Sequence, residues 1–170
     1  MIDLAYRWYP VYTKSRAEKK AYQELQKKGI EAYLPLKKEL KQWSDRKKIV
    51  EEPLLKSYIF VRISCKEQTD VLMTQGISRF LYFSGKIAVM PDKQMEDLKL
   101  LMANSDELEL IEHHIQPGEK VRINAGPMQG MLAELVSIKN KKTLILKLEH
   151  LGYALEIKTS MAFVEPLEKK

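Results

Sequence analysis

The side chains that could do chemistry in this sequence are few and scattered. The histidines are His113, His114 and His150, and the one cysteine is Cys65. A zinc site needs three or four such ligands at fixed spacing, and these residues do not provide it. His113 and His114 are adjacent, so in an extended chain their side chains point in opposite directions. We therefore expect no metal centre and interpret both as solvated residues of a connecting segment.

Motifs for nucleophilic catalysis and phosphate binding are also missing. Cys65 follows a predicted strand with no motif around it, so we interpret it as a structural thiol. The segment 126–130, Gly-Pro-Met-Gln-Gly, lacks the Lys-Ser/Thr pair of a phosphate-binding loop. No carboxylate is singled out by its surroundings. These observations make an enzyme the weakest class of function, and we expect no catalytic residue and no cofactor.

Composition limits the remaining classes. Of the 170 residues, 45% are hydrophobic and 31% are charged, which is typical of a folded protein. The apolar runs are too short to cross a membrane, and the N-terminus lacks the pattern of a secretory signal. A lone cysteine is typical of a reducing compartment, so we expect a cytoplasmic protein with no membrane partner. The net charge of +6 favours a polyanionic partner.

Charge is unevenly distributed along the chain. Residues 1–104 contain 20 Lys/Arg and 13 Asp/Glu, and residues 118–170 contain nine Lys/Arg and six Asp/Glu. Residues 105–117 contain four acids and no Lys/Arg. This acidic stretch ends in Gln116-Pro117-Gly118, which is typical of a turn. We therefore predict an N-terminal domain over 1–104, an acidic linker over 105–117 and a C-terminal domain over 118–170.

The N-terminal block predicts an α+β sandwich. Ala17, Ala21 and Leu25 are four residues apart and Gly29 follows, which is typical of an amphipathic helix over residues 14–28 and of its end. The polar segment 39–50 predicts an exposed hairpin tip centred on Trp43-Ser44-Asp45-Arg46. Further helices are predicted over 67–74 and 91–103, and strands over 6–13, 30–36, 54–63, 79–84 and 87–90.

The C-terminal block has a different pattern. Five short segments separated by Gly, Asn or polar residues predict strands over 120–124, 131–138, 143–149, 153–158 and 162–165. Five strands in so short a chain indicate a small β-barrel, because closing the sheet removes exposed edges. Good helix formers over 128–136 and 144–151 leave a helical hairpin as an alternative, but the Gly, Pro, Ile and Val content favours strands.

Two basic clusters predict a binding function. On a helical wheel of about 100° per residue, Arg16, Lys20 and Lys27 lie together, opposite the apolar Leu25. A solvated helix surface is the alternative for any single helix. The second cluster lies beside Trp43 in the predicted hairpin, and cations next to an aromatic ring suit phosphates and unstacked bases. That cluster consists of Arg46, Lys47 and Lys48.

The N-terminal block resembles the amino-terminal domain of NusG-type transcription elongation factors, and the C-terminal block resembles a KOW domain, an SH3-like barrel. The matching N-terminal segments are residues 8–12 (WYPVY), 29–35 (GIEAYLP), 52–61 (EPLLKSYIFV), 76–80 (GISRF) and 89–91 (VMP). The KOW resemblance rests on 118–123 (GEKVRI) and on Gly126, Pro127, Met128 and Gly130. Leu55-Lys56-Ser57 stands where the family usually has Phe-Pro-Gly. Residues 42–48 and 52–54 are most similar to the RfaH and UpxY antiterminators of long polysaccharide operons.

This resemblance implies a factor that suppresses pausing or termination by binding the clamp helices of RNA polymerase. Aromatic and apolar residues would form the polymerase-binding face: Trp8, Tyr12, Leu55, Tyr58 and Phe83. Non-template or upstream DNA at the transcription bubble would contact Lys14, Arg16, Lys20, Lys27, Trp43, Arg46, Lys47, Lys48 and Gln75. Ribosomal protein S10 or the termination factor Rho would bind the KOW domain, with Met128, Met131 and Ile138 as candidate contacts. We expect a monomer.

Two other functions remain open at this point. One is a housekeeping NusG that also recruits Rho. The other is a KOW-type RNA-binding module associated with the ribosome, which would bind structured RNA without polymerase.

Overall fold

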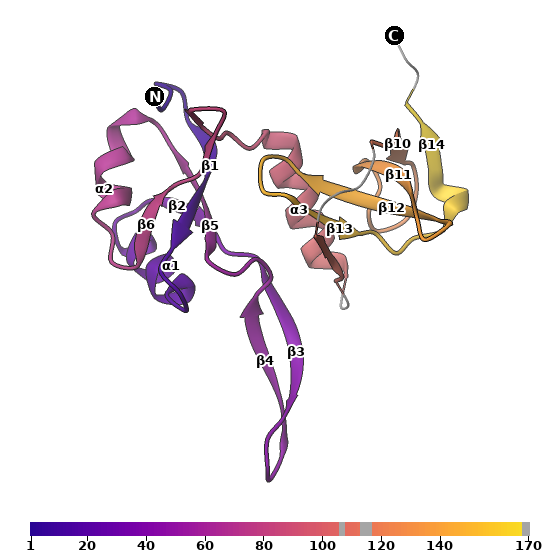
Figure 1. The fold of residues 1–170 in the computed structure, drawn as a ribbon, viewed down its shortest axis with the longest axis horizontal. Coiled ribbons are helices and arrows are strands. Elements are labelled where there is room, and N and C mark those ends of the chain that lie inside the picture. The colour runs from indigo at the N-terminus through magenta and orange to yellow at the C-terminus, as the bar shows by residue number, and fades with distance from the viewer. Residues whose placement is uncertain (106–107, 113–116, 168–170) are drawn as a thin grey trace. The chain divides into compact units, whose positions relative to one another are not determined.

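The computed structural model describes residues 1–105, 108–112 and 117–167. The fold is mixed α/β with several antiparallel sheets, and the chain divides into two compact units, Met1–Asp92 and Lys93–Lys170 (Figure 1). The units are described separately below.

A four-stranded antiparallel sheet forms the first unit, in the order β2-β5-β1-β6. The strands are β1 (Arg7–Thr13), β2 (Glu31–Tyr33), β5 (Tyr58–Ile63) and β6 (Ile77–Phe80). Side chains alternate between the two faces, so Tyr9 and Val11 of β1 share a face with Ile59 and Val61 of β5. This face packs in one buried cluster with Ala21 and Leu25 of helix α1 (Glu18–Lys27) and Val71 of α2 (Gln68–Leu72). A 3-10 helix, Cys65–Glu67, precedes α2.

Helix α1 begins later than predicted. The backbone of Arg16 lies in the left-handed region, with a φ of 57°, and Lys14 donates its N–H to the carbonyl of Gly76 at 2.8 Å. A left-handed residue cannot continue a right-handed helix, so α1 starts only at Glu18. Lys14 and Arg16 therefore precede the helix and do not extend its face. Gly76, with a φ of 92°, lies close to this segment, since a Cβ there would approach those of Ala17 and Ala21 to 3.1 Å.

The predicted exposed hairpin is present as a two-stranded ribbon. Strands β3 (Leu36–Gln42) and β4 (Lys47–Pro53) pair in register from Leu36 opposite Pro53 to Gln42 opposite Lys47. Trp43 N–H donates to the carbonyl of Arg46 at 2.8 Å and closes the turn. Figure 1 shows the ribbon projecting from the four-stranded sheet. A smaller hairpin, β7 (Tyr82–Phe83) with β8 (Lys86–Ile87), completes this unit.

Within the described residues, the second unit contains one antiparallel sheet in the order β14-β10-β11-β12-β13-β9. The bounds of the C-terminal strands are β10 (Glu119–Ile123), β11 (Leu132–Ile138), β12 (Lys141–Leu148), β13 (Tyr153–Glu156) and β14 (Val164–Pro166). A 3-10 helix, Met161–Phe163, precedes β14. These five strands follow the predicted pattern. Strand β9 (Leu110–Glu112) was not expected, because it lies in the predicted acidic linker.

The acidic stretch is thus partly strand. Leu110, Ile111 and Glu112 pair with β13, and Glu156 N–H donates to the carbonyl of Glu109 at 3.0 Å. Backbone pairing of this kind depends little on side-chain type, which is why an acidic composition did not reveal it. His113, His114 and Gln116 lie outside the described residues.

Helix α3 (Asp92–Asn104) packs on the sheet of the second unit, whereas the sequence placed it in the first domain. The side-chain amide of Gln94 donates to the carbonyl of Lys147 at 2.7 Å and accepts the N–H of Glu149 at 3.1 Å. Asp97 accepts the N–H of Leu132 at 3.2 Å. These bonds attach two turns of α3 to β11 and β12, while the division into domains at residues 104 and 118 stays a prediction.

Candidate nucleic-acid and protein interfaces

Exposed cations surround the tip of the β3–β4 ribbon. Arg46, Lys47 and Lys48 are exposed, and none of them forms an ion pair with the residues that the structure describes. The ring of Trp43 beside them is 54% exposed. An exposed indole and three unpaired cations can contact phosphates and stack on an unpaired base. The structure therefore brings four of the predicted nucleic-acid residues together.

The two faces of the ribbon differ. Register and alternation put Lys38, Leu40, Gln42, Lys47, Ile49 and Glu51 on one face, which we call the Leu40 face, and all six are exposed. The opposite face, which we call the Glu39 face, carries Lys37, Glu39, Lys41, Lys48, Val50 and Glu52. Its acids are paired: Lys37 Nζ lies 3.9 Å from Glu39 Oε2, and Lys41 forms a short ion pair with Glu52. The Lys41 hydrogen bond lowers the pKa of Glu52, and the same bond raises the pKa of Lys41.

A second basic group lies around α1. Lys14, Arg16, Lys20 and Lys27 are all exposed. Lys27 Nζ lies 2.7 Å from Glu24 Oε1, and this hydrogen bond lowers the pKa of Glu24. The bond between Lys14 N–H and the Gly76 carbonyl brings the segment with the exposed Gln75 beside Lys14. The base of the ribbon is joined to the same helix, since Lys19 Nζ donates to the Glu51 carbonyl at 2.5 Å.

The residues predicted to bind polymerase lie at different depths. Trp8, Leu55 and Tyr58 are buried, Tyr12 is half-buried and Phe83 is 53% exposed on β7. Tyr12 and Tyr58 pair across β1 and β5, with ring centroids 4.7 Å apart and hydroxyl groups at 3.0 Å. The sheet therefore brings Trp8, Tyr12 and Tyr58 to the face opposite α1 and α2.

Sequence reasoning missed two residues in this region. Arg79 lies directly opposite Tyr12 in the β1–β6 pair, and its guanidinium lies 4.8 Å from the centre of the Tyr12 ring, a cation–π contact. The feature that could have revealed Arg79 is the register of β1 against β6, because it places Arg79 opposite Tyr12. The second is Glu18, which is 6% exposed and accepts the Ser57 N–H at 2.7 Å. Ser57 has a φ of 64°, so it takes the left-handed conformation at the position that corresponds to the glycine of the Phe-Pro-Gly pattern.

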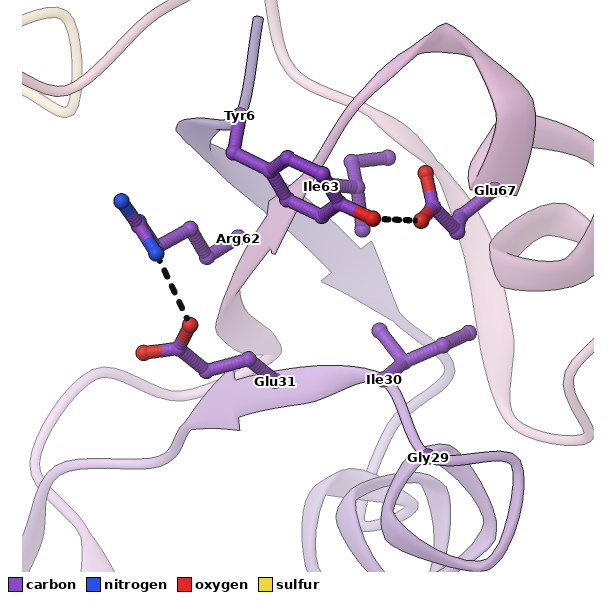
Figure 2. A pocket seen from close by; sticks show the side chains of 7 residues that line it. All are labelled: Tyr6, Gly29, Ile30, Glu31, Arg62, Ile63 and Glu67. Carbon is purple, nitrogen blue, oxygen red and sulfur yellow. Dashed lines mark hydrogen bonds and ion pairs between the residues drawn. The ribbon is translucent and has the colours of Figure 1, made fainter.

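A half-open pocket of about 320 Å³ lies elsewhere in the first unit (Figure 2). It is lined by Tyr6, Gly29, Ile30, Glu31, Arg62, Ile63 and Glu67. Arg62 Nη1 lies 3.3 Å from Glu31 Oε2, and the Tyr6 hydroxyl donates to Glu67. The Ser64 hydroxyl bond, followed by that from Tyr6, lowers the pKa of Glu67 to about 2, and the Glu67 bond raises the pKa of Tyr6. None of the predicted site residues lines this pocket.

In the second unit, the segment that resembles a KOW motif forms a tight loop between β10 and β11. Gly126 and Gly130 have φ values of 79° and 87°, and Gly130 N–H donates to the Ile123 carbonyl at 2.7 Å. Space is limited at Gly126, because a Cβ would lie 3.4 Å from the Phe163 ring. Among the candidate contacts, Met131 is fully buried, Met128 is 6% exposed and Ile138 is half-buried. Pro127 lies within the loop.

The described residues contain neither a metal-binding cluster nor a helix suited to a membrane. No group of three or more His, Cys, Asp or Glu in that part of the chain could hold a metal ion. No helix there is long and apolar enough to span a membrane.

Comparison with known proteins agrees with this fold. A family model described as transcription termination factor nusG matches residues 6–99, more than half of the chain. The structure is similar to that of NusG from Thermotoga maritima, with a TM-score of 0.51 and 18% identity over 96% of this chain and 98% of that one. A structure of the MjSpt4:Spt5 complex matches at 18% identity with a TM-score of 0.29, over 96% of this chain and 99% of that one.

The first unit thus combines a four-stranded antiparallel sheet with a cationic two-stranded ribbon. The chain belongs to the NusG family of transcription factors.

Proposed function

We propose that this protein is a transcription elongation and antitermination factor that binds the clamp helices of RNA polymerase and suppresses pausing or termination on specific long polysaccharide operons. The observation that carries the proposal is the free-standing β3–β4 ribbon with Arg46, Lys47 and Lys48 unpaired among the described residues. The protein would act as a cytoplasmic monomer.

The mechanism requires no chemical step. A factor that binds the closed clamp more tightly than the open one shifts the enzyme away from its paused state by that difference in binding free energy. A factor of about 10 in the closed-to-open ratio needs about 1.4 kcal/mol of differential binding.

The polymerase contact would use Trp8, Tyr12 and Tyr58 on the sheet face opposite α1 and α2, together with Leu55 and with Phe83 on its own hairpin. Tyr12 and Phe83 would supply most of the exposed area, because the other three side chains are buried. Aromatic anchors dominate most protein interfaces. The Tyr12–Tyr58 pair supports this assignment, because the two rings are in contact and the Arg79 guanidinium lies over the Tyr12 ring. A folded Tyr58→Ala variant that co-purifies with polymerase as well as wild type would remove Tyr58 from the contact.

The nucleic-acid contact would combine the two basic groups on the first unit. Lys14, Arg16, Lys20 and Lys27 would follow the phosphates of the non-template or upstream DNA, with Trp43 or Gln75 near an unpaired base. The bond from Lys19 to Glu51 supports their joint action, because it links the ribbon to α1. Such contacts give affinity that falls steeply with salt.

The C-terminal strands would form a five-stranded KOW barrel that binds ribosomal protein S10 or Rho. The exposed loop residues Gly126 and Pro127 and the half-buried Ile138 would lie at that surface, whereas Met128 is buried. Met131 would belong to the hydrophobic core instead, because it is fully buried.

Run-on transcription on a long template with purified polymerase tests the proposal. Wild type should shorten pauses and increase read-through, and a variant with Arg46, Lys47 and Lys48 changed to Ala should lose much of this effect. Increased Rho-dependent termination would indicate the housekeeping factor. Tight binding to structured RNA, with no effect on polymerase, would indicate the ribosome-associated alternative.

A further inference from the structure

The Leu40 face of the ribbon has an unusual combination of side chains for a solvent-facing strand pair. Leu40 and Ile49 lie directly opposite each other and are 61% and 65% exposed. Gln42 and Lys47 form the next pair toward the tip, and Lys38 lies on the other side. The face thus presents two branched apolar side chains between hydrogen-bond donors.

The dimensions of the ribbon would allow it to enter the major groove of DNA. Two paired strands are about 4.8 Å apart, and seven residues of β3 span about 24 Å. The major groove of B-DNA is about 12 Å wide and admits a two-stranded ribbon. Only β3 and β4 form the ribbon, so its outer part is accessible (Figure 1).

Charge favours DNA over a protein as the occupant. Residues 40–49 contain four cations and one acid, Asp45. The acids Glu39 and Glu52 lie on the other face and are paired with lysines, so they would point away from the groove floor. On the Leu40 face, the acid is Glu51, at the base of the ribbon. A DNA groove is flanked by negatively charged phosphates, which complement this excess of positive charge near the tip of the ribbon.

We propose that the β3–β4 ribbon reads double-stranded DNA by lying in the major groove with its Leu40 face toward the base edges. Gln42 and Lys47 donate to acceptors on the bases, and Leu40 and Ile49 contact thymine methyl groups. Arg46 and Lys48 contact the phosphates and set the register. This inference rests on the proposed function and gives its operon preference a physical source: sequence-specific contact with duplex DNA.

The test uses the full-length protein and a pool of short DNA duplexes with a randomised central segment. Repeated selection should enrich a preferred sequence that binds about 10-fold more tightly than its shuffled version. In a double variant, Leu40→Ala with Ile49→Thr, this preference should fall to about 2-fold, while affinity for shuffled duplex stays within about 2-fold of wild type. Val50→Thr is the matched control, because it makes a similar change one residue away on the Glu39 face and should keep the preference.

The remaining outcomes each overturn the inference. If selection enriches no sequence, or if the double variant keeps the wild-type preference, the Leu40 face does not read DNA. If the double variant keeps its DNA preference but loses binding to purified polymerase, the face is a protein-docking surface. Pause suppression on templates with and without the selected sequence separates this inference from the proposed function. A wild-type protein that suppresses pausing equally on both refutes only the groove reading, whereas one that suppresses pausing on neither refutes the function.

Discussion

The carboxylate of Asp97 in α3 accepts the backbone N–H of Leu132, the first residue of β11, at 3.2 Å. Asp97 is only 2% exposed, and its other oxygen forms an ion pair with Lys93 at 2.5 Å. Lys93 also donates to the Gly130 carbonyl at 3.0 Å, so a single cluster joins α3 to the loop between β10 and β11.

Replacing Asp97 should loosen this attachment. Asp97→Ala leaves the Leu132 N–H without its acceptor, which costs about 2 kcal/mol. Amide hydrogen exchange at Leu132 should become about 30-fold faster in the full chain. Glu96→Ala is the control, because Glu96 is exposed on the same turn of α3, and it should leave the exchange rate near that of wild type. Equal exchange in the two variants would contradict the structural role of Asp97.

Ser57 should be sensitive to side-chain shape. Its φ of 64° is unfavourable for a β-branched residue, so Ser57→Val should lower the free energy of unfolding by about 2 kcal/mol. Ser57→Gly should be neutral or stabilising by up to about 1 kcal/mol. Urea denaturation measures both effects. Ser78→Val, the same change at an exposed strand position in β6, is the control. A Ser57→Val protein as stable as Ser78→Val would show that the left-handed turn is not required.

Lys20 and Lys27 should contribute unequally to DNA binding. The ammonium of Lys27 lies 2.7 Å from Glu24, and this neighbouring acid reduces its net attraction for phosphate. Lys20→Ala should therefore lower the slope of log affinity against log salt by about 0.9, and Lys27→Ala by clearly less. Titration of duplex DNA at several salt concentrations measures the slopes. Equal slope changes would contradict the effect assigned to Glu24, and no change for Lys20 would place that lysine on a merely solvated surface.

Acid should weaken the first unit through Glu67. Hydrogen bonds from Ser64 and Tyr6 lower its pKa from 4.5 to about 2, so the folded state binds this proton more weakly than the unfolded state does. The resulting stability is fully present above about pH 5 and is lost as the pH falls toward 2. Glu67→Gln should therefore lower the urea midpoint at pH 6 more than at pH 3. Ser64→Ala, which removes the largest cause, should give a similar but smaller pattern. A pH-independent difference for Glu67→Gln would contradict the assignment.

Several elements could be predicted from side-chain pattern alone. Periodicity located α1, α3 and the main strands, and the polar residues around Trp43 located the ribbon tip. The start of α1 was missed because Arg16 is a residue type that rarely adopts a positive φ. The packing of α3 was not predicted, because Gln94 and Asp97 form hydrogen bonds with backbone groups. Every residue type has these groups, so the sequence does not indicate which residues are the partners.

In the candidate site too, some features could be predicted from the sequence and others could not. The cations of the ribbon tip were predicted, since a polar turn exposes them. The residues that form the Leu40 face could not be predicted, because this depends on the pairing of Leu40 with Ile49. A shift of one residue in register would change which side chains share a face.

Strands β9 and β14 lie at the two ends of the six-stranded order, where backbone groups could pair with another chain. Both contain features that discourage such pairing. Strand β9 has only three residues and follows Glu109, whose carboxylate lies 3.3 Å from Lys158 Nζ. Strand β14 ends at Pro166, which has no N–H to donate. Glu109, one of the acids that suggested a simple connector, therefore also protects the edge of this sheet against pairing with another chain, and Glu109→Gln should lower solubility before it changes any binding activity.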